Sequence, residues 1–478
     1  MSEPVVRHGT PPGAASGDVP EVPVAIIGAG ACGLTTALLL KDAGIEAVLL
    51  ERDAEPSGST ALSSGFVPAP GTQVQRARGV DDSVAKFADD IRAKAKGTAA
   101  PHLLEAYARA IGPAIDALGE RHGIAWELLD GFLYPGHSAL RMHAVPERTG
   151  AGLMQRLQSA AQAAGVDLLT QATVRELWIG TDKRITGVGY ERPDGRIEHL
   201  RCEALLLACN GFGGNAAMVR ELLPEMRDAT FGGHVGNDGS AIAWGRAIGA
   251  RLADLGGYQG HGSWAVPQGV LISWALMMEG GVQLNARGER FHDETGGYSE
   301  ASVAVLAQPG GTAWNVIDES LLPLAQTFPD FREAQAAGAC RRAESVDELA
   351  RIIGCEVPSL QSTLDAMTTS AQARQPDAFG RTFARPLQAP FTAIRVTGAL
   401  FHTQGGLDID AQCRVLDTQG QPLPNLCAAG GAARGVSGNA VWGYLSGNGL
   451  LSAIAGGAIA AQTLASLLRH ASKAIAHD

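Results

Sequence analysis

The stretch Val24–Glu51, VAIIGAGACGLTTALLLKDAGIEAVLLE, reads as an apolar strand, a glycine-rich turn, a helix and a second strand that ends in an acid. Gly28 allows the tight turn, Gly30 lets backbone N–H groups approach a pyrophosphate, and Gly33 lets the helix pack closely on the strand. The N-terminus of the helix then faces the phosphates. Glu51 lies near the offset of about 20 residues at which a carboxylate accepts hydrogen bonds from ribose hydroxyls. Because these features agree, the stretch predicts a dinucleotide-binding unit.

Length, charge and cysteine usage narrow the class of protein. The 478 residues exceed one compact core, so we expect two domains or one domain with a large insertion. The net charge is −11 and no run of Lys or Arg is present, so nucleic acid is not an expected partner. The seven cysteines are scattered without a Cys-x-x-Cys pair, which indicates buried free thiols in a reducing compartment and no metal site. We therefore expect a cytoplasmic protein.

Two segments at the ends of the chain need separate treatment. Residues 1–21 mix Pro, Gly, Ser and charge without an apolar core, so we predict a disordered leader and not a signal peptide. The uncharged run Gly435–Leu468 is long enough to span a bilayer. Its first half has turn composition, however, and Leu450–Leu468 is predicted to be a buried Ala- and Gly-rich helix packed close to a cofactor. No transmembrane segment is expected.

The elements between these segments indicate an α/β fold. The small and hydroxyl residues of Ser57–Gly65 suit a loop around a large flat cofactor, although a solvated loop has the same composition. The stretch 187–200, GVGYERPDGRIEHL, is typical of a hairpin with Asp194-Gly195 at its turn. The stretch 204–215, ALLLACNGFGGN, predicts a buried strand that runs into another glycine turn.

The alternation of strands and helices is lost over part of the second half. Between about Trp264 and Leu387 the pattern is mixed and ends in a Pro-rich segment, and strand-like sequence returns at Phe391. Such a change of composition predicts an inserted domain. We therefore assign residues 22–262 and 389–470 to the dinucleotide-binding domain and 263–388 to a capping or substrate domain.

With this order of elements, the chain resembles the flavoprotein superfamily of soluble fumarate reductases, succinate dehydrogenase flavoprotein subunits and 3-ketosteroid dehydrogenases. The similarity extends from about Pro23 to Leu467. The motifs that carry it are Gly28-Ala-Gly30-Ala-Cys-Gly33, LLLACNGFGGN, Asn237-Asp238-Gly239, Gly288-Glu-Arg290-Phe291 with Glu294, His402-Thr-Gln-Gly-Gly406 and Ala428-Ala-Gly-Gly431.

This resemblance implies FAD, held by a Rossmann-like domain of the glutathione-reductase type with an inserted α+β capping domain. The substrate would then lie between the cap and the isoalloxazine. Succinate dehydrogenase-type subunits tether FAD through a histidine in the small-residue loop, but Gly58–Gly65 contains none, so we expect non-covalent FAD. The resemblance implies cofactor contacts at Gly28, Gly30, Gly33, Glu51, Arg52, Ser59, Thr60, Ser64, Gly65, Val174, Asn210, Gly211, Asn237, Asp238, Gly431, Asn448 and Leu450.

The chain departs from the fumarate-type pattern at three arginines. In this superfamily the flavin exchanges a hydride with one carbon, and a protein group exchanges a proton at the neighbouring carbon beside a carbonyl or carboxylate. Fumarate-type enzymes clamp the carboxylates with two arginines and donate the proton from a third. Gly435, Tyr298 and Leu322 stand near the corresponding places here. A C4-dicarboxylate substrate is therefore not expected unless Arg434 or Arg287 replaces the clamp.

Two tyrosines are candidates for proton transfer. The stretch RFHDETGGYSE, which contains Tyr298, resembles the ketosteroid dehydrogenase motif in which a tyrosine removes a proton beside a ketone. A phenol has a pKa of about 10, so it acts as a base only when neighbours or a helix dipole stabilise its anion. Ketosteroid enzymes have a second tyrosine in the C-terminal glycine-rich segment, where this chain has Tyr444 beside Trp442. The alternative for Tyr298 is a core tyrosine, and the alternative for Tyr444 and Trp442 is a place in the pocket wall.

Two histidines match those that bind the substrate in fumarate-type enzymes. His261 and His402 lie in the matching local contexts, and either would polarise an enone oxygen in the same way. A structural role is the alternative for each. Arg290 and Glu294 are expected to form an ion pair that orders the loop carrying Tyr298.

We therefore predict an FAD-dependent oxidoreductase that acts on a CH–CH or C=C bond next to a carbonyl, with ketone-bearing substrates favoured. Only the first glycine motif has the full strand–turn–helix context, so no second site for NADH is expected and an unidentified electron donor or acceptor completes the cycle. One alternative is a reductase of an unsaturated carboxylate. A flavin-binding redox sensor or electron-transfer subunit is the other.

Overall fold

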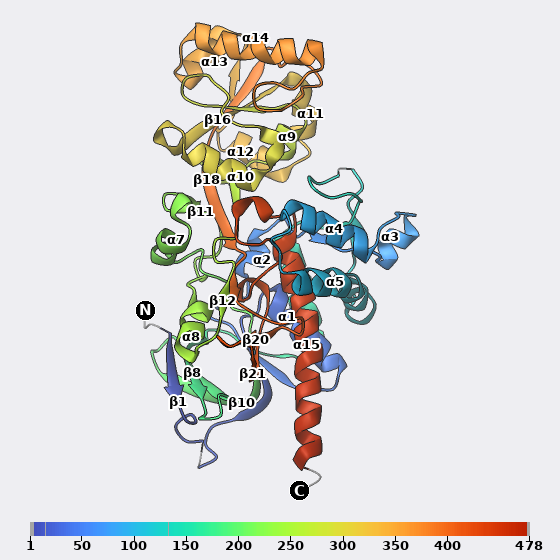
Figure 1. The fold of residues 1–478 in the computed structure, drawn as a ribbon, viewed down its shortest axis with the longest axis vertical. Coiled ribbons are helices and arrows are strands. Elements are labelled where there is room, and N and C mark those ends of the chain that lie inside the picture. Colours follow the sequence, from blue (N-terminus) through green and yellow to red (C-terminus); the bar gives the residue numbers. More distant parts are fainter. Residues whose placement is uncertain (1–3, 15, 132, 476–478) are drawn as a thin grey trace. The chain divides into compact units, whose positions relative to one another are not determined.

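The computed structural model describes residues 4–14, 16–131 and 133–475, with side chains as far as residue 469. The chain forms two compact units (Figure 1). Unit 1 comprises Met1–Leu222, Gly233–Tyr258 and His402–Asp478. Unit 2 comprises Leu223–Gly232 and Gln259–Phe401.

Unit 1 is built on a nine-stranded sheet in the order β1-β8-β9-β10-β2-β3-β7, with β21 paired to β10 and β20 to β21. The strands are β1 Val5–His8, β2 Glu21–Ile27, β3 Ala47–Leu50, β7 Asp167–Leu169, β8 Thr173–Ile179, β9 Ile185–Glu191, β10 Ile197–Leu207, β20 Arg414–Leu416 and β21 Pro422–Ala428. Strands β3, β2, β10 and β21 are parallel neighbours. Their apolar runs are buried, as is usual for parallel strands covered on both faces.

Two small sheets complete the strands of unit 1. They consist of β4 Val67–Pro68, β5 Glu127–Leu128 and β6 Met142–Ala144, and of β12 Leu252–Ala253 with β19 Gly406–Leu407. The helices of unit 1 are α1 Ala31–Asp42, α2 Gly58–Leu62, α3 Gln73–Ala77, α4 Val84–Lys94, α5 Pro101–His122, α6 Gly150–Ala163, α7 Ala216–Leu222, α8 Ser240–Ile248 and α15 Asn448–Ile475.

Helix α15 runs through the core of unit 1 beside α1 and α5 (Figure 1). Asn448–Arg469 is long and apolar enough to cross a bilayer by length and composition, but 72 % of its most apolar window is buried inside the protein. Packing against α1 and α5 therefore accounts for its Ala- and Gly-rich sequence, as predicted for Leu450–Leu468.

Unit 2 contains a seven-stranded sheet in the order β14-β13-β18-β16-β15, with β11 and β17 also paired to β18. The strands are β11 Thr230–Phe231, β13 Tyr258–Ala265, β14 Val270–Leu271, β15 Val282–Leu284, β16 Thr312–Asp318, β17 Arg341–Ala343 and β18 Phe391–Thr403. The helices are α9 Ala275–Met278, α10 Tyr298–Leu306, α11 Leu322–Ala325, α12 Pro329–Ala336, α13 Val346–Ile353 and α14 Val357–Ala373.

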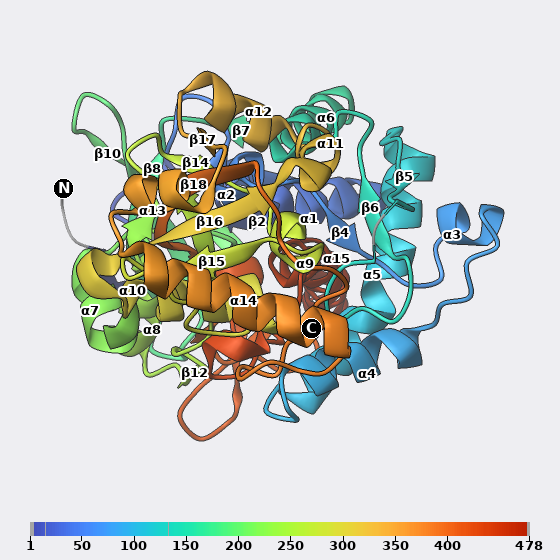
Figure 2. The ribbon, with the colours of Figure 1, turned by 90° about the horizontal axis from the view of Figure 1, so that it is seen from above.

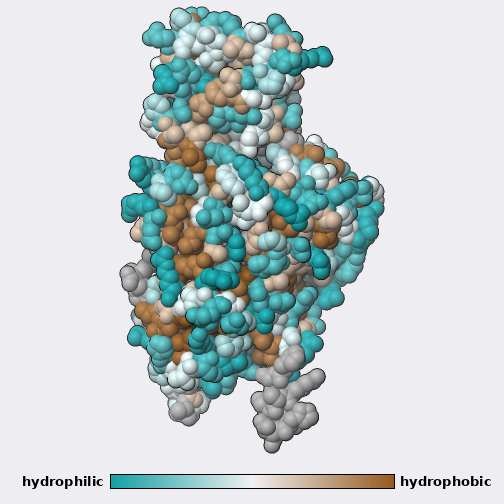
Figure 3. Space-filling view, viewed as in Figure 1, coloured by the Kyte–Doolittle hydropathy of each residue, from teal (hydrophilic) through white to brown (hydrophobic). Residues whose placement is uncertain are grey.

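Alternation along β16 divides the core of unit 2 between the two faces of the sheet. Trp314 and Val316 pack in the cluster formed with α13 and α14, which lie together over the sheet (Figures 1 and 2). Ala313 and Ile317 belong to the cluster formed with α10 and α12. Successive strand residues point to opposite faces, so one strand serves both cores. The outer surface over α13 and α14 is mainly hydrophilic (Figure 3).

Two boundary predictions differ from the structure. The leader predicted to be disordered contains strand β1, which pairs in parallel with β8, and Arg7 forms an ion pair with Glu176 at 3.2 Å. Two adjacent valines suit an edge strand, but the Pro- and Gly-rich surroundings hide this signal in the composition. Unit 2 is wider than the predicted 263–388, because β13 begins before residue 263, β18 follows the Pro-rich segment, and β11 comes from an earlier part of the chain.

Candidate active site

The three glycines of the first turn meet different constraints. Gly28 has φ +102°, and a Cβ there would lie 2.6 Å from the Ala208 carbonyl oxygen. A Cβ on Gly33 would lie 2.0 Å from the Gly28 oxygen, so both positions require glycine for the fold itself. A Cβ on Gly30 would meet only the Thr60 hydroxyl, at 3.6 Å. Protein packing therefore does not require glycine at position 30, which leaves open space at the N-terminus of α1 for a ligand.

The carboxylate of Glu51 closes the same corner of unit 1. It is buried, and its two oxygens accept hydrogen bonds from the N–H groups of Ala29 at 2.9 Å and Asp53 at 3.0 Å. Each oxygen has a second lone pair, so the group keeps the capacity to accept from ribose hydroxyls. The Glu51 carbonyl accepts a hydrogen bond from the N–H of Ala172, which lies just before β8 and two residues before Val174. This bond ties the end of β3 to the start of β8.

Several predicted contact residues from distant parts of the sequence converge near this turn. The hydroxyl of Ser59 accepts hydrogen bonds from the side-chain amides of Asn210 at 3.0 Å and Asn237 at 2.8 Å. The hydroxyl of Thr60 accepts from the N–H of Ala31, the first residue of α1. Arg52 donates to the Gly236 carbonyl at 2.7 Å and pairs with Asp238 at 3.3 Å. These bonds order the loops after β3, β10 and β11 around the turn.

The remaining predicted contact residues differ in their burial and in the groups that surround them. Ser64 is exposed, whereas Gly65 is buried against the Thr149 carbonyl. Val174 and Leu450 are buried apolar residues of β8 and α15. Gly431 lies against Asn210 and Gly211, because a Cβ on Gly431 would approach both.

Two polar atoms at the start of α15 lack partners. Asn448 is fully buried and Ser452 is 2 % exposed, and within the described part of the chain neither Asn448 Oδ1 nor Ser452 Oγ has a hydrogen-bond partner. An unpaired buried polar group costs free energy and is rare in native proteins. Together with the open space at Gly30 and the Glu51 carboxylate, these orphan atoms fit an FAD.

In unit 2, Tyr298 and His261 form a stacked pair. Gly297, with φ +127°, precedes Tyr298 at the first turn of α10, and the ring of Tyr298 lies 4.9 Å from that of His261 with 20° between the planes. Trp274 and Phe401 contact the His261 ring edge-on. Burial lowers the pKa of His261 to about 3, so the ring is neutral near pH 7. Its Nδ1 accepts from the N–H of Ser263 at 3.1 Å, which leaves the proton on Nε2.

The loop before Tyr298 is fixed by a buried ion-pair cluster around Glu294. Arg290 donates to both carboxylate oxygens, at 2.9 and 2.6 Å, and Arg381 donates at 2.8 Å. Burial raises the pKa of Glu294, but the hydrogen bonds and charge of Arg290 and the charge of Arg381 outweigh this and lower the pKa below its usual value. The predicted pair of Arg290 and Glu294 is present. Arg381 was missed, because nothing near it in the sequence marks a partner 87 residues away.

In unit 1, His402 and Tyr444 form a second pair of rings. Their centroids lie 5.5 Å apart with 71° between the planes. Burial lowers the pKa of His402 to about 4, so this ring is also neutral near pH 7. A Cβ on Gly449 would lie 2.8 Å from Nε2 of His402, so the Nε2 edge of the imidazole faces the first turn of α15.

Arg434 does not have the surroundings of a substrate clamp. Its guanidinium donates to Asp254 at 2.6 Å and to Asp408 at 3.3 Å, so two carboxylates already surround the one positive charge. Arg287 is 63 % exposed and pairs with Glu289 at 2.7 Å. These two carboxylates balance the charge of Arg434, which disfavours it as a replacement for the missing clamp. The sequence did not show these acidic partners.

A second buried network, absent from the sequence predictions, holds the segment before α15. Arg141 is 1 % exposed and donates to both oxygens of Asp82 and to Nδ1 of His137. Burial and the Arg141 charge lower the pKa of His137 to about 4, and its Nε2–H donates to the Ser446 carbonyl at 3.0 Å. Residues Asp82 and Arg141 are far apart in sequence and isolated in it, so no local pattern could have identified them.

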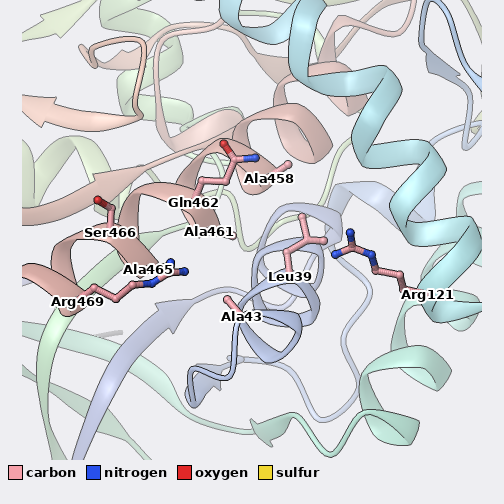
Figure 4. Close-up of a pocket in the computed structure, with 9 residues that line it drawn as sticks. All are labelled: Leu39, Ala43, Arg121, Ala458, Ala461, Gln462, Ala465, Ser466 and Arg469. Carbon is pink, nitrogen blue, oxygen red and sulfur yellow. The ribbon is translucent and has the colours of Figure 1, made fainter.

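A separate cavity of about 500 Å³ lies among the C-terminal halves of α1, α5 and α15 (Figure 4). It is lined by Leu39, Ala43, Arg121, Ala458, Ala461, Gln462, Ala465, Ser466 and Arg469. At a rise of 1.5 Å per residue, Ala458 is about 15 Å along α15 from Asn448, so the cavity is distinct from the cofactor corner. Among the described residues, no cluster of His, Cys, Asp and Glu could hold a metal ion.

Comparisons with known proteins show the family and the fold of the chain. The model of the FAD binding domain family matches residues 23–450. A probable fumarate reductase of Shewanella frigidimarina is 27 % identical over 456 residues, which cover 94 % of this chain and 76 % of that protein. The open conformation of a flavocytochrome c3 fumarate reductase superposes with a TM-score of 0.81 at 26 % identity, covering 95 % of this chain and 80 % of that one.

A second solved structure shares the fold at lower identity. The 3-ketosteroid-Δ4-(5α)-dehydrogenase of Rhodococcus jostii superposes with a TM-score of 0.73 at 24 % identity, covering 94 % of this chain and 97 % of that one. These comparisons confirm the predicted fold class, a Rossmann-like domain with an inserted cap, and the predicted resemblance.

Proposed function

The chain belongs to the FAD binding domain family, and from that premise we propose that it exchanges hydrogen with a carbon–carbon bond next to a ketone carbonyl. It is an FAD-dependent oxidoreductase of the fumarate reductase type. When bound, FAD supplies hydride exchange with one carbon of that bond. Residues of this chain then have to orient the substrate, polarise its carbonyl and exchange a proton at the neighbouring carbon.

The observation that carries this proposal is the stacked pair of Tyr298 and His261. Tyr298 is the first residue of α10, at the end of the helix whose dipole favours negative charge. His261 is neutral, and its proton is on Nε2, so this ring donates a hydrogen bond and does not compete for the proton. We assign proton transfer to Tyr298 and carbonyl polarisation to His261.

In unit 1, His402 and Tyr444 form a second pair of a histidine and a tyrosine, and we propose similar roles for them. His402 is partly buried and neutral, which suits it to donate a hydrogen bond to an oxygen on which negative charge develops. Tyr444, which contacts its ring edge-on, is the second candidate for proton transfer. An external electron donor or acceptor completes the catalytic cycle.

The arginines favour a ketone over a dicarboxylate. The charge of Arg434 is balanced by Asp254 and Asp408, and Arg287 pairs with Glu289 at the surface. A carboxylate that leaves water without a cationic partner bears a penalty of several kcal/mol. Similarity to a probable fumarate reductase favours an unsaturated carboxylate as the second candidate.

We expect fumarate and succinate to react at least about 100-fold more slowly than an enone or saturated ketone, since about 3 kcal/mol corresponds to that factor. The test is anaerobic photoreduction of the bound flavin, followed by a screen of enones and unsaturated acids for reoxidation. Reoxidation by enones supports the proposal. Efficient reoxidation by fumarate alone would replace it with the unsaturated-carboxylate function.

The purified protein is expected to release FAD on acid precipitation, because the Gly58–Gly65 loop contains no histidine to tether it. Gly30→Val is expected to yield mostly apoprotein, because the added side chain occupies the space left open for the pyrophosphate. Flavin absorbance of the supernatant and the pellet measures both results. Flavin retained in the pellet would contradict non-covalent binding, and a fully loaded variant would contradict the position of the phosphates.

A further inference from the structure

A chain of buried polar side chains begins at the first residue of α15 and ends against the partly buried ring of His402. The side-chain amide of Asn448 donates to Ser437 Oγ at 3.0 Å, and the Ser437 hydroxyl donates to Gln404 Oε1 at 2.8 Å. The amide nitrogen of Gln404 then lies 3.1 Å from Nδ1 of His402. Asn448 and Ser437 are fully buried and Gln404 is 4 % exposed, so water does not substitute for these bonds.

The bonds of this chain have one consistent direction. A serine hydroxyl has a single proton, and because Ser437 accepts from Asn448, that proton is available for Gln404 Oε1. An acceptor at Oε1 places the NH₂ end of the Gln404 amide against His402. An amide NH₂ only donates, so Nδ1 of His402 has to offer its lone pair and the ring proton has to be on Nε2.

We propose that Asn448, Ser437 and Gln404 are positioning residues that fix His402 in the neutral tautomer with the proton on Nε2. Gln404 sets the tautomer by direct contact, and Ser437 and Asn448 set the orientation of Gln404. The Nε2 edge faces the first turn of α15, where Gly449 leaves room for it. His402 and the three positioning residues all belong to unit 1.

The opposite direction of the chain is also chemically complete, so something has to select between the two. If the Asn448 amide were turned, its oxygen would accept from Ser437, the Gln404 oxygen would face His402, and the ring proton would move to Nδ1. In the observed direction, Asn448 Oδ1 is buried without a partner in the described part of the chain. A bound FAD that offers an N–H group to this oxygen would hold the observed direction.

No charged side chain of the described residues is among the causes of the lowered pKa of His402. The causes of the lowered pKa of His402 are burial, which dominates, and the opposing Thr403 carbonyl. Tyr444 is the titratable side chain against the ring. The Thr403 carbonyl lies 3.4 Å from Nδ1 of His402 and would accept a proton there, so it opposes the Gln404 amide, which is closer at 3.1 Å. The tautomer of His402 therefore depends on the polarity of Gln404.

Gln404→Glu reverses this polarity with little change in shape. A carboxylate only accepts, so it takes the Ser437 proton on one oxygen and a proton from Nδ1 of His402 on the other. We expect the ¹⁵N signals of selectively labelled, FAD-loaded protein to show Nδ1 without a proton in the parent and with a proton in the variant. The variant is also expected to titrate at higher pH, because an adjacent carboxylate favours the imidazolium.

Flavin reduction supplies the second measurement, which rests on the proposed function. Loss of the Nε2–H donor should lower the rate about 10²–10³-fold with a smaller change in substrate binding, and His402→Ala combined with Gln404→Glu should be no slower than His402→Ala alone. Ser437→Ala should weaken the preference for Nε2–H, and Ser437→Thr, which keeps the hydroxyl, should restore it. Gln462→Glu, at an exposed position of α15, is the matched control for added charge.

The two measurements separate the possible failures. Unchanged His402 signals in Gln404→Glu would overturn the positioning role, whatever the substrate. A shifted tautomer in a protein that reduces neither enones nor ketones would support the positioning role and contradict the proposed function.

Discussion

Tyr298→Phe is expected to reduce the rate of flavin reduction by a saturated ketone about 10²–10⁴-fold, the usual contribution of a general acid or base. Phenylalanine retains the ring that stacks on His261 and removes only the hydroxyl, so the fold and FAD content should be unchanged. Stopped-flow absorbance of the flavin under anaerobic conditions measures the rate. An alkaline limb in the pH dependence of the parent should disappear in the variant, because the hydroxyl that titrates has been removed.

The matched control is Tyr190→Phe, which removes the hydroxyl of a buried tyrosine of β9 in unit 1 and should leave the rate within a few-fold of the parent. His261→Ala and His402→Ala should slow the reaction but keep the alkaline limb, because they remove hydrogen-bond donors to the carbonyl. If Tyr298→Phe reduced its flavin within a few-fold of the parent, the assignment would be wrong and the proton-transfer role would pass to Tyr444.

Glu294→Gln is expected to lower the free energy of unfolding of unit 2 by about 3–5 kcal/mol, the usual cost of removing one partner from a buried ion pair. Glu294 is fully buried between Arg290 and Arg381, and the neutral amide leaves both guanidinium groups without this counter-charge. Hydrogen exchange of peptides from β15 and α10, at several urea concentrations, measures the loss locally.

The pH dependence of the free energy of unfolding should also differ between the parent and Glu294→Gln. The folded-state pKa of Glu294 is below its ordinary value of 4.5, so its contribution is present above that pH and is lost as the pH falls through the folded-state value. This part of the acid destabilisation should be absent in Glu294→Gln. Glu289→Gln, at an exposed pair with Arg287, should change stability by less than about 1 kcal/mol. Equal stability of the two variants would show that the cluster does not hold unit 2 together.

The features that the sequence predicted are those encoded by neighbours along the chain. The glycines of the first turn, the acid at the end of β3 and the hairpin at Asp194-Gly195 each depend on a few adjacent residues, and the structure has all three. The Ala-rich sequence of α15 was interpreted correctly because turn residues precede it and its length suits a core helix.

The features that the sequence did not predict depend on contacts between distant residues. Arg434 was considered a candidate clamp because it stands next to Gly435, near the position of the missing arginine, and its main partner Asp254, 180 residues away, could not be recognised. Gln404 and Ser437 carry no motif, and their role depends on the direction of hydrogen bonds that only the folded chain defines. Strand β1 was missed because pairing with β8, and not local composition, makes it a strand.

The most direct test of the proposed function compares single-turnover reoxidation of the photoreduced flavin by an enone and by fumarate, in the parent and in Tyr298→Phe. The proposed chemistry predicts fast reoxidation of the parent by the enone, at least about 100-fold slower reoxidation by fumarate, and loss of the enone reaction in the variant. Fast reoxidation by fumarate that is insensitive to Tyr298→Phe would contradict it.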